Sequence, residues 1–338
     1  MIQAEGLTKQ FGAFTAIADV SFEVARGEIV GFLGPNGAGK STTMRILAGV
    51  FPPTSGRATV AGYNVVADAR RARSVVGYFP ERVSIYTDMT VRGYLAYVAE
   101  MKDLPRAESR RQCDAVMQSC AVAHMQHRLI GTLSKGYRQR VGIAQALIGS
   151  PRVLILDEPT SGLDPEQVAE MRTLIRGLHG ERTVILSTHI LSEVEATCDR
   201  VIIINKGRVL AVDTPRNLNQ RLRQTSEIHL EAIGPEAAIT SRLQKIPGVL
   251  RIDSAVPALH PSDGATALRI STAKDRDLRA DIAAAVTAGG WGLRELRPLT
   301  LSLEDIFLTM VANPGGNSAP PPTANPSAPD ESLRHLSA

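Results

Sequence analysis

The chain contains a glycine-rich nonapeptide, Gly34-Pro35-Asn36-Gly37-Ala38-Gly39-Lys40-Ser41-Thr42, inside the longer stretch from Glu28 to Gly49. The apolar run Ile29–Leu33 comes before it and is typical of a buried strand, whereas Met44, Ile46 and Leu47 after it have helical spacing. Strand, glycine-rich loop and helix in this order form the context that the pattern G-x-x-x-x-G-K-[ST] requires. A surface turn followed by a chance Lys-Ser pair would lack these flanks.

Each residue type in this loop has a physical role in phosphate binding. The glycines allow successive backbone N–H groups to point inward, and a helix that begins at Lys40 adds unpaired N–H groups and a positive dipole end. Lys40 is expected to bridge the β- and γ-phosphates, and Ser41 to offer its hydroxyl to Mg²⁺. The loop therefore predicts binding of a nucleoside triphosphate.

The amino-acid composition limits the size of the fold, the class of partner and the cellular compartment. The chain has 338 residues, of which 43% are hydrophobic and 21% charged, so a large core and two domains are expected. A net charge of +4 is too small to indicate nucleic-acid binding. Cys113, Cys120 and Cys198 show no metal-ligand spacing and no disulfide framework, which favours a reducing compartment. No secretion signal and no membrane span is expected.

Apolar strands alternate with helical segments up to about residue 220, which predicts a largely parallel α/β core. Residues 82–145 are expected to form a helical part of this nucleotide-binding domain 1–220. Residues 221–312 show the order β-α-β-β-α-β, which predicts a small α+β domain with helices on one antiparallel sheet. The proline-rich end, 313–338, is expected to be disordered.

Two strand ends carry candidate catalytic groups. The apolar run Val153–Leu156 ends at Asp157 and Glu158, and a second buried strand ends at His189. Asp157 could hold Mg²⁺, Glu158 could orient and polarise the attacking water, and His189 could contact both the γ-phosphate and Glu158. Parallel strands deliver their carboxyl ends to one edge of the sheet, so these groups are expected to meet Lys40 there. An isolated Asp-Glu pair or a single loop histidine would more often be an ordinary solvated residue.

At these residues the chain resembles the ATP-binding subunits of ABC transporters, over about residues 2–218. The resemblance rests on the phosphate loop, Leu133–Arg140, the Asp-Glu strand, the Ser-Gly-Leu-Asp turn at 161–164 and His189, which occur in the family's order and spacing. It implies ATP and Mg²⁺ as cofactors and a homodimer that encloses two ATP molecules. Further roles are implied for four residues: stacking on adenine by Phe11, γ-phosphate contact in the other copy by Ser134 and Gly136, and coupling of the two sites by Asp164.

The chain departs from the family pattern at three positions. Lys135 and Tyr137 replace the first Gly and the Gln of the usual Leu-Ser-Gly-Gly-Gln, but Ser134 and Gly136 are retained. Glu81 stands where the family usually has glutamine; a carboxylate can reach Mg²⁺ or its water but cannot donate a hydrogen bond.

Pro80-Glu81, the string Leu133–Arg140 and Ser302–Phe307 resemble exporter ATPases that pair with type-2 ABC permeases of the gliding-motility and multidrug branches. The resemblance implies a separate membrane permease as partner, no nucleic-acid partner, and a cytoplasmic location on the inner face of the membrane. The permease is expected to dock near Ile85, Tyr86 and Met89, although these three could equally be core residues.

Two other functions remain open from the sequence. A soluble ABC ATPase acting on nucleic acid or ribosomes typically has two cassettes or a long coiled-coil insertion, and this chain has neither. A ligand-sensing role of the C-terminal unit is compatible with its strand order, but packing or dimer contacts explain that unit more simply.

Overall fold

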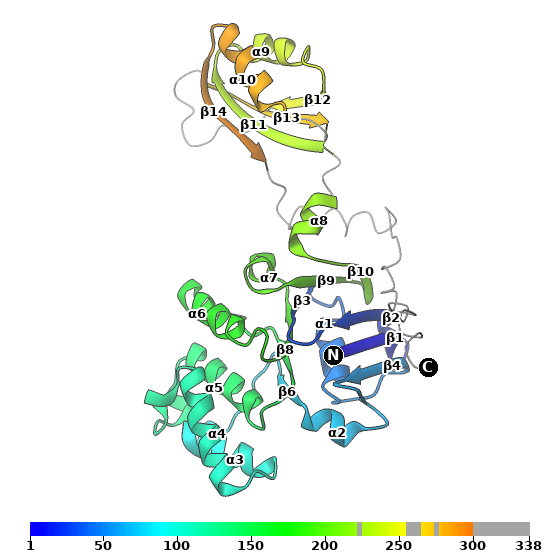
Figure 1. Ribbon diagram of the computed structural model, residues 1–338, viewed down its shortest axis with the longest axis vertical. Helices are drawn as coiled ribbons and strands as arrows, with labels where there is room; N and C mark the ends of the chain where they lie inside the picture. Colours follow the sequence, from blue (N-terminus) through cyan, green and yellow to red (C-terminus); the bar gives the residue numbers. More distant parts are fainter. Residues whose placement is uncertain (222–224, 255–264, 274–276, 300–338) are drawn as a thin grey trace, which may run out of the picture.

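The computed structural model describes residues 1–221, 225–254, 265–273 and 277–299, which form three β-sheets with helices around them (Figure 1). Among these residues, no helix is long and apolar enough to cross a membrane. The Ser302–Phe307 segment and the proline-rich end, 313–338, lie outside the described residues.

The central sheet has six strands in the order β10-β9-β3-β8-β7-β6. Pairing is parallel except between β10 and β9, which form an antiparallel hairpin through Lys206-Gly207. Every residue of β3, β7 and β8 is buried, as expected for parallel strands covered on both faces. The strands are β3 (Ile29–Leu33), β6 (Val76–Phe79), β7 (Val153–Asp157), β8 (Thr183–Thr188), β9 (Arg200–Asn205) and β10 (Arg208–Asp213). The predicted parallel core is confirmed.

A second, antiparallel sheet has the order β2-β1-β4-β5. Its strands are β1 (Ile2–Phe11), β2 (Phe14–Val24), β4 (Ser55–Val60) and β5 (Tyr63–Asn64). Apolar residues of this sheet, of α1 (Lys40–Leu47) and of one face of the central sheet form one hydrophobic core. Phe11 ends β1 and pairs with Phe14, so the turn between β1 and β2 consists of Gly12 and Ala13.

The remaining helices of the first 221 residues flank these sheets (Figure 1). A second core joins α3, α4 and α5 to the other face of the central sheet. The remaining helices, with the short 3-10 helices labelled η, are α2 (Ala69–Ser74), α3 (Val91–Met101), α4 (Arg106–Ser119), η1 (Ala123–Met125), η2 (Ile130–Thr132), α5 (Lys135–Leu147), α6 (Pro165–Arg176), α7 (Leu191–Thr197) and α8 (Pro215–Arg221).

The helical part is interrupted after α4. Within the helical part expected over residues 82–145, the chain from Pro105 to Met125 is not one continuous helix, because Ala121 has a φ of 55°, a left-handed conformation that ends α4. The N–H groups of Ala121 and Val122 bond back to carbonyls of the last helical turn at 3.0 and 2.9 Å. Cys113 and Cys120 both pack into the core as free cysteines.

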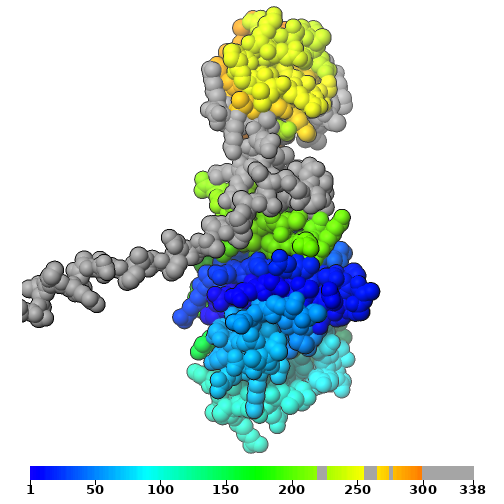
Figure 2. Space-filling model, turned by 90° about the vertical axis from the view of Figure 1, so that its right-hand side faces the viewer, coloured from blue at the N-terminus to red at the C-terminus, as the bar shows by residue number. Residues whose placement is uncertain are grey.

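Residues 225–299 form a unit with a core of its own (yellow to orange in Figure 2). Its antiparallel sheet has the order β12-β13-β11-β14, and both helices pack on one face, as the β-α-β-β-α-β order predicts. The elements are β11 (Thr225–Ile233), α9 (Glu236–Leu243), β12 (Val249–Ser254), β13 (Ala265–Ala273), α10 (Arg279–Ala288) and β14 (Gly292–Leu299).

Candidate active site

The phosphate loop connects β3 to α1, as predicted, and close packing requires glycine at two of its positions. A Cβ atom on Gly34 would lie 2.4 Å from the carbonyl oxygen of Ile204. Gly39, with a φ of 105°, precedes the first residue of α1, and its Cβ would lie 2.5 Å from a methyl group of Ile17. Asn36 and Gly37 are exposed at the tip of the loop, whereas Ala38 is buried.

Lys40 is the first residue of α1, and its side chain is only 6% exposed. Its ammonium group donates to the carbonyl oxygens of Gly34 at 2.9 Å and Pro35 at 3.3 Å. The same nitrogen lies 3.2 Å from Oε1 of Glu158. These three partners hold the Lys40 ammonium at the mouth of the phosphate loop. Anionic oxygens of a ligand can take the place of the loop carbonyls and Glu158 as partners of Lys40 there.

Asp157, the last residue of β7, is fully buried next to α1. Its Oδ1 accepts hydrogen bonds from the hydroxyls of Ser187 at 2.5 Å and Ser41 at 3.1 Å. Burial raises the pKa of the Asp157 carboxyl, the two serine hydroxyls lower it, and the nearby charges of Glu81 and Glu158 raise it further. Its Oδ2 is buried and has no hydrogen-bond partner among the residues that the structure describes. An orphaned buried carboxylate oxygen beside a serine hydroxyl is a donor set that fits a hard cation such as Mg²⁺.

Glu158 follows β7 in an unusual backbone conformation with a φ of 53°. Its N–H donates to both the carbonyl and the hydroxyl oxygen of Ser187, each at 3.1 Å, which holds this strained turn against the end of β8. Its carboxylate lies between two basic groups: Oε1 faces Lys40, and Oε2 lies 2.9 Å from Nδ1 of His189. The predicted meeting of Lys40, Glu158 and His189 at one sheet edge is therefore present.

We call the group that these contacts join the catalytic edge: Lys40, Ser41, Asp157, Glu158, Ser187 and His189. Ser187 was not predicted as a site residue, although it bonds both Asp157 and the backbone of Glu158. Its position in the Ser187-Thr188-His189 end of a buried strand was the available signal. Glu81 is exposed, and its charge acts on Asp157, but among the described residues it makes no hydrogen bond or ion pair with the catalytic edge.

Ser134, Gly136 and Asp164 lie in a separate place, around a cavity of about 410 Å³. Ser134 caps α5 by accepting from the N–H of Tyr137, and Asp164 caps α6 by accepting from the N–H of Gln167 at 2.9 Å. We call this region the signature face; its lining includes Ser134, Gly136, Tyr137, Arg140, Asp164 and Gln167. Within the described chain, no hydrogen bond or ion pair links these six residues to the catalytic edge.

Lys135 and Tyr137, the two unusual residues of the signature, both make contacts within the chain. The Lys135 ammonium lies over Gly162, where a Cβ atom would come within 2.1 Å of it. The Tyr137 hydroxyl lies 3.2 Å from Nε2 of His124. Both side chains therefore anchor α5 to neighbouring loops.

Phe11 belongs to a third group, at the tip of the antiparallel sheet. Its ring is 50% exposed and meets Phe51 edge to face at a centroid distance of 5.7 Å. The Lys9 ammonium lies 5.3 Å from the Phe11 centroid and 5.0 Å from that of Phe51. Lys9 and Phe51 were not predicted, because neither has a sequence pattern of its own.

Residues 17–161 match the family model described as ABC transporter. The linearmycin resistance ATP-binding protein LnrL of Bacillus subtilis is 31% identical over 92% of this chain and 98% of its own length. The chain belongs to the ABC transporter ATP-binding proteins. The bacitracin transport ATP-binding protein BcrA of Bacillus licheniformis is 38% identical over 68% of this ABC ATPase and 75% of its own length.

Solved structures agree with this assignment. An ATP-binding subunit of an ABC transporter matches with a TM-score of 0.60 and 30% identity, over 65% of this chain and 92% of that one. The cbiO1 protein from Clostridium perfringens matches with a TM-score of 0.58 and 30% identity, over 65% and 95% of the two chains. This ABC ATPase is therefore an ATP-binding and ATP-hydrolysing transporter subunit, and a role on nucleic acid or ribosomes is not favoured.

Proposed function

We propose that two copies of this chain bind two ATP molecules head to tail, and that hydrolysis separates them. The separation of the catalytic edge from the signature face supports this proposal, because no hydrogen bond or ion pair among the described residues joins the two within one chain. In a two-fold dimer, Ser134 and Gly136 of one copy contact the γ-phosphate held by Lys40 of the other, and Asp164 couples the two sites. ATP then acts as the ligand that holds the copies together.

Within each site, Glu158 orients and polarises the attacking water, and His189 holds the Glu158 carboxylate and contacts the γ-phosphate. The observation that carries this assignment is the placement of the Glu158 carboxylate between Lys40 and His189 at 3.2 and 2.9 Å. The strained φ of Glu158 fixes that carboxylate at the strand end. The backbone of Gly34–Thr42 binds the phosphates, and Phe11 stacks on adenine.

Mg²⁺ fits the residues at the end of β7. Ser41 and Asp157 would hold it directly or through water, because Asp157 has an unpartnered buried oxygen next to the Ser41 hydroxyl. Glu81 would contribute a further carboxylate through water. When bound, the ion neutralises charge on the β- and γ-phosphates.

The partner in the membrane is a permease of the type-2 exporter class, which places this subunit at the cytoplasmic face of the membrane. The relatives named for linearmycin resistance, bacitracin transport and Nod factor export support an export role.

Residues 1–220 form the ATPase domain, with its helical part at about 82–145, and residues 221–312 form the accessory domain.

The structure refines the proposed docking surface. Ile85 and Met89 are partly buried against the core, in keeping with the alternative of core packing. Tyr86 is 54% exposed and lies edge to face with Tyr97 at a centroid distance of 5.6 Å. We assign Tyr86 and Tyr97 to the permease contact, since exposed neighbouring tyrosines supply apolar area with a polar tip.

The test is to co-express the full chain with the membrane protein encoded beside it and to purify both in detergent. The parent chain should retain the membrane protein, and Tyr86→Glu should lose it while keeping ATP binding. Phe14→Glu is the matched control, because Phe14 is an exposed aromatic on the distant antiparallel sheet. Recovery of DNA or ribosomes without any membrane protein would contradict the proposal.

A further inference from the structure

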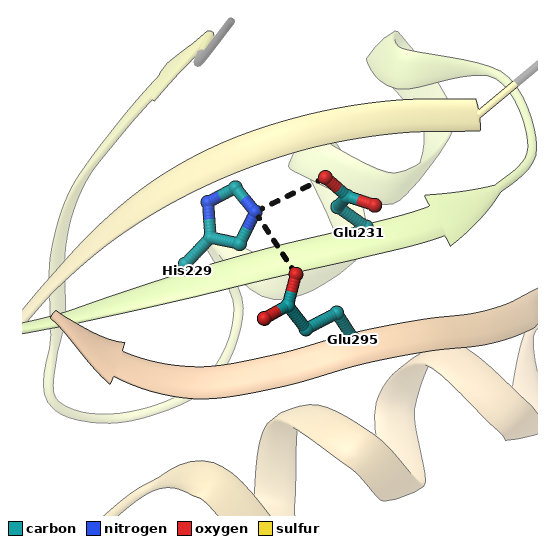
Figure 3. Close-up of side chains that lie close together, drawn as sticks. All are labelled: His229, Glu231 and Glu295. Carbon is teal, nitrogen blue, oxygen red and sulfur yellow. Dashed lines mark hydrogen bonds and ion pairs between the residues drawn. The ribbon is translucent and has the colours of Figure 1, made fainter. Parts of the chain in front are cut away.

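The outer face of the C-terminal sheet gathers one histidine and two glutamates. His229 and Glu231 are alternate residues of β11 and so point to the same face, while Ile228, Leu230 and Ala232 point to the helices and the core. Glu295 lies on the neighbouring strand β14. Figure 3 shows the imidazole of His229 between the two carboxylates.

The distances in this group fit ligand separations around a metal, and the shorter of them is at the same time a long hydrogen bond. Nε2 of His229 lies 3.3 Å from Oε1 of Glu231 and 3.7 Å from Oε2 of Glu295. Hydrogen bonds from nitrogen to oxygen usually measure about 2.7–3.2 Å. Two ligands at about 2.0–2.1 Å from a tetrahedral Zn²⁺ are separated by roughly 3.4 Å, which the two observed distances bracket. One ligand atom from each residue lies within 4.8 Å of the others.

The strand register gives a second, independent observation. Glu231 and Glu295 are direct partners across the β11–β14 pair. Like charges placed directly opposite one another destabilise a sheet, and a cation between them would add to the compensation that His229 and Arg297 already give. Arg297 contacts Oε1 of Glu295 at 2.7 Å, on the oxygen other than the one that faces His229.

Burial and backbone pairing pre-organise the three donors. The side chains of His229 and Glu231 are 7% and 12% exposed, and that of Glu295 is 38% exposed. The ladder from Glu227 to Ile233 fixes both strands, so little movement is needed to bring the donors to one ion. The bond from Arg297 orients the Glu295 carboxylate, as partners of metal ligands commonly do.

We propose that His229, Glu231 and Glu295 bind a divalent transition-metal ion of the Zn²⁺ type. One imidazole nitrogen and two carboxylates suit such an ion, whereas Mg²⁺ prefers an all-oxygen set. Three protein ligands leave a position for water or for a group from another molecule. The ion joins β14 to β11 and stabilises the C-terminal unit by binding only its folded form.

The test uses the full-length chain, stripped of metal and kept in excess Mg²⁺, and titrates Zn²⁺ alone by calorimetry. The parent should bind one Zn²⁺ at this site and unfold at a higher temperature with Zn²⁺ than without it. Glu295→Gln should weaken binding at least tenfold, and His229→Gln should abolish it. Glu295→Gln keeps shape at a partly exposed position, so it provides a folded variant if His229→Gln does not fold.

Glu227→Gln is the matched control, because Glu227 lies on the same face of β11, two residues before His229. It should bind Zn²⁺ as the parent does. Co²⁺ gives an independent readout, since its visible absorption reports nitrogen and oxygen ligands in the parent and should be lost with His229→Gln. Equal Zn²⁺ binding by the parent, Glu295→Gln and His229→Gln, or no saturable binding by the parent, would overturn the proposal.

Discussion

The catalytic edge and the signature face differ in which polar groups they bring together within one chain. At the catalytic edge, buried charged groups hold one another: Lys40 contacts Glu158, Glu158 contacts His189, and Ser187 contacts Asp157. At the signature face, Ser134 and Asp164 cap helices around a cavity of about 410 Å³. The first region is a network of charged and hydroxyl side chains in which, among the described residues, Asp157 keeps one unpartnered oxygen, and the second is a cavity beside two helix N-termini.

This difference indicates a division of labour. A pre-formed network can bind phosphate and position water by itself, whereas an open, polar cavity at two helix N-termini is suited to receive an anion that another molecule presents. Changes at the catalytic edge should therefore affect ATP binding and hydrolysis within one copy. Changes at the signature face should affect the contact with the ATP that the other copy holds.

Replacing the residue that orients water should have the largest effect. Glu158→Gln keeps the size of the side chain but removes the base, so ATP turnover should fall by about 10²–10⁴-fold. ATP affinity should change little, because Lys40 and the loop backbone remain. A steady-state phosphate-release assay measures the rate, and a variant that turns over at the parental rate would remove Glu158 from the mechanism.

Gly136→Asp should separate the two regions. A carboxylate at this point of the signature face repels an incoming phosphate, so ATP turnover should fall at least tenfold, while the monomer should still bind ATP. Lys40→Ala, at the catalytic edge, should lower both the turnover and the affinity for ATP. Fluorescent ATP titration and a turnover assay on the two variants make the comparison, and an equal loss of ATP affinity in both would contradict it.

Phe11→Ala should have a moderate effect confined to nucleotide affinity. An aromatic contact contributes about 0.5–1.5 kcal/mol, so the KM for ATP should rise roughly 2- to 10-fold with kcat unchanged. Phe14→Ala is the matched control, since Phe14 is even more exposed, at 65%, and is Phe11's strand partner. A fall in kcat alone would exclude a role in binding adenine.

Asp157→Asn should give the smallest effect, a gain rather than a loss: it should raise the free energy of unfolding of the nucleotide-free chain. A charged carboxylate here is buried, has one unpartnered oxygen, and lies near Glu81 and Glu158. Removing that charge should stabilise the chain by about 1 kcal/mol, an increase in Tm of roughly 2–4 °C. The extra stabilisation by Mg-ATP should be lost. Calorimetry with and without Mg-ATP measures both, and an unchanged response to Mg-ATP would exclude Asp157 as a metal ligand.

The sequence predicted the elements of the fold well where local signals agree with tertiary packing. The strand, loop and helix around Lys40, the parallel strands ending at Asp157 and His189, and the strand order of the C-terminal unit all follow from periodicity and glycine placement. The break after α4 was not predicted, because Ala121 is not a residue type that signals a left-handed turn.

The site was predictable as far as charged strand ends could be recognised. Phe51 and Lys9 were not predictable, because their roles depend on which segments the fold brings together. Ser187 had a signal in its place at the end of a buried strand, but its bonds to Asp157 and Glu158 depend on the pairing of β7 with β8. His229, Glu231 and Glu295 were not predictable for the same reason: Glu295 follows Glu231 by 64 positions (295 − 231) in the sequence, and only the β11–β14 register makes them neighbours.

The most direct test of the two-region account is the mass of Glu158→Gln in solution by light scattering. Without nucleotide the chain should be a monomer, and with saturating Mg-ATP it should have twice that mass; Gly136→Asp in the same background should stay monomeric. A Glu158→Gln chain that remains a monomer with saturating Mg-ATP, also in the presence of its permease, would contradict the claim that ATP joins two copies.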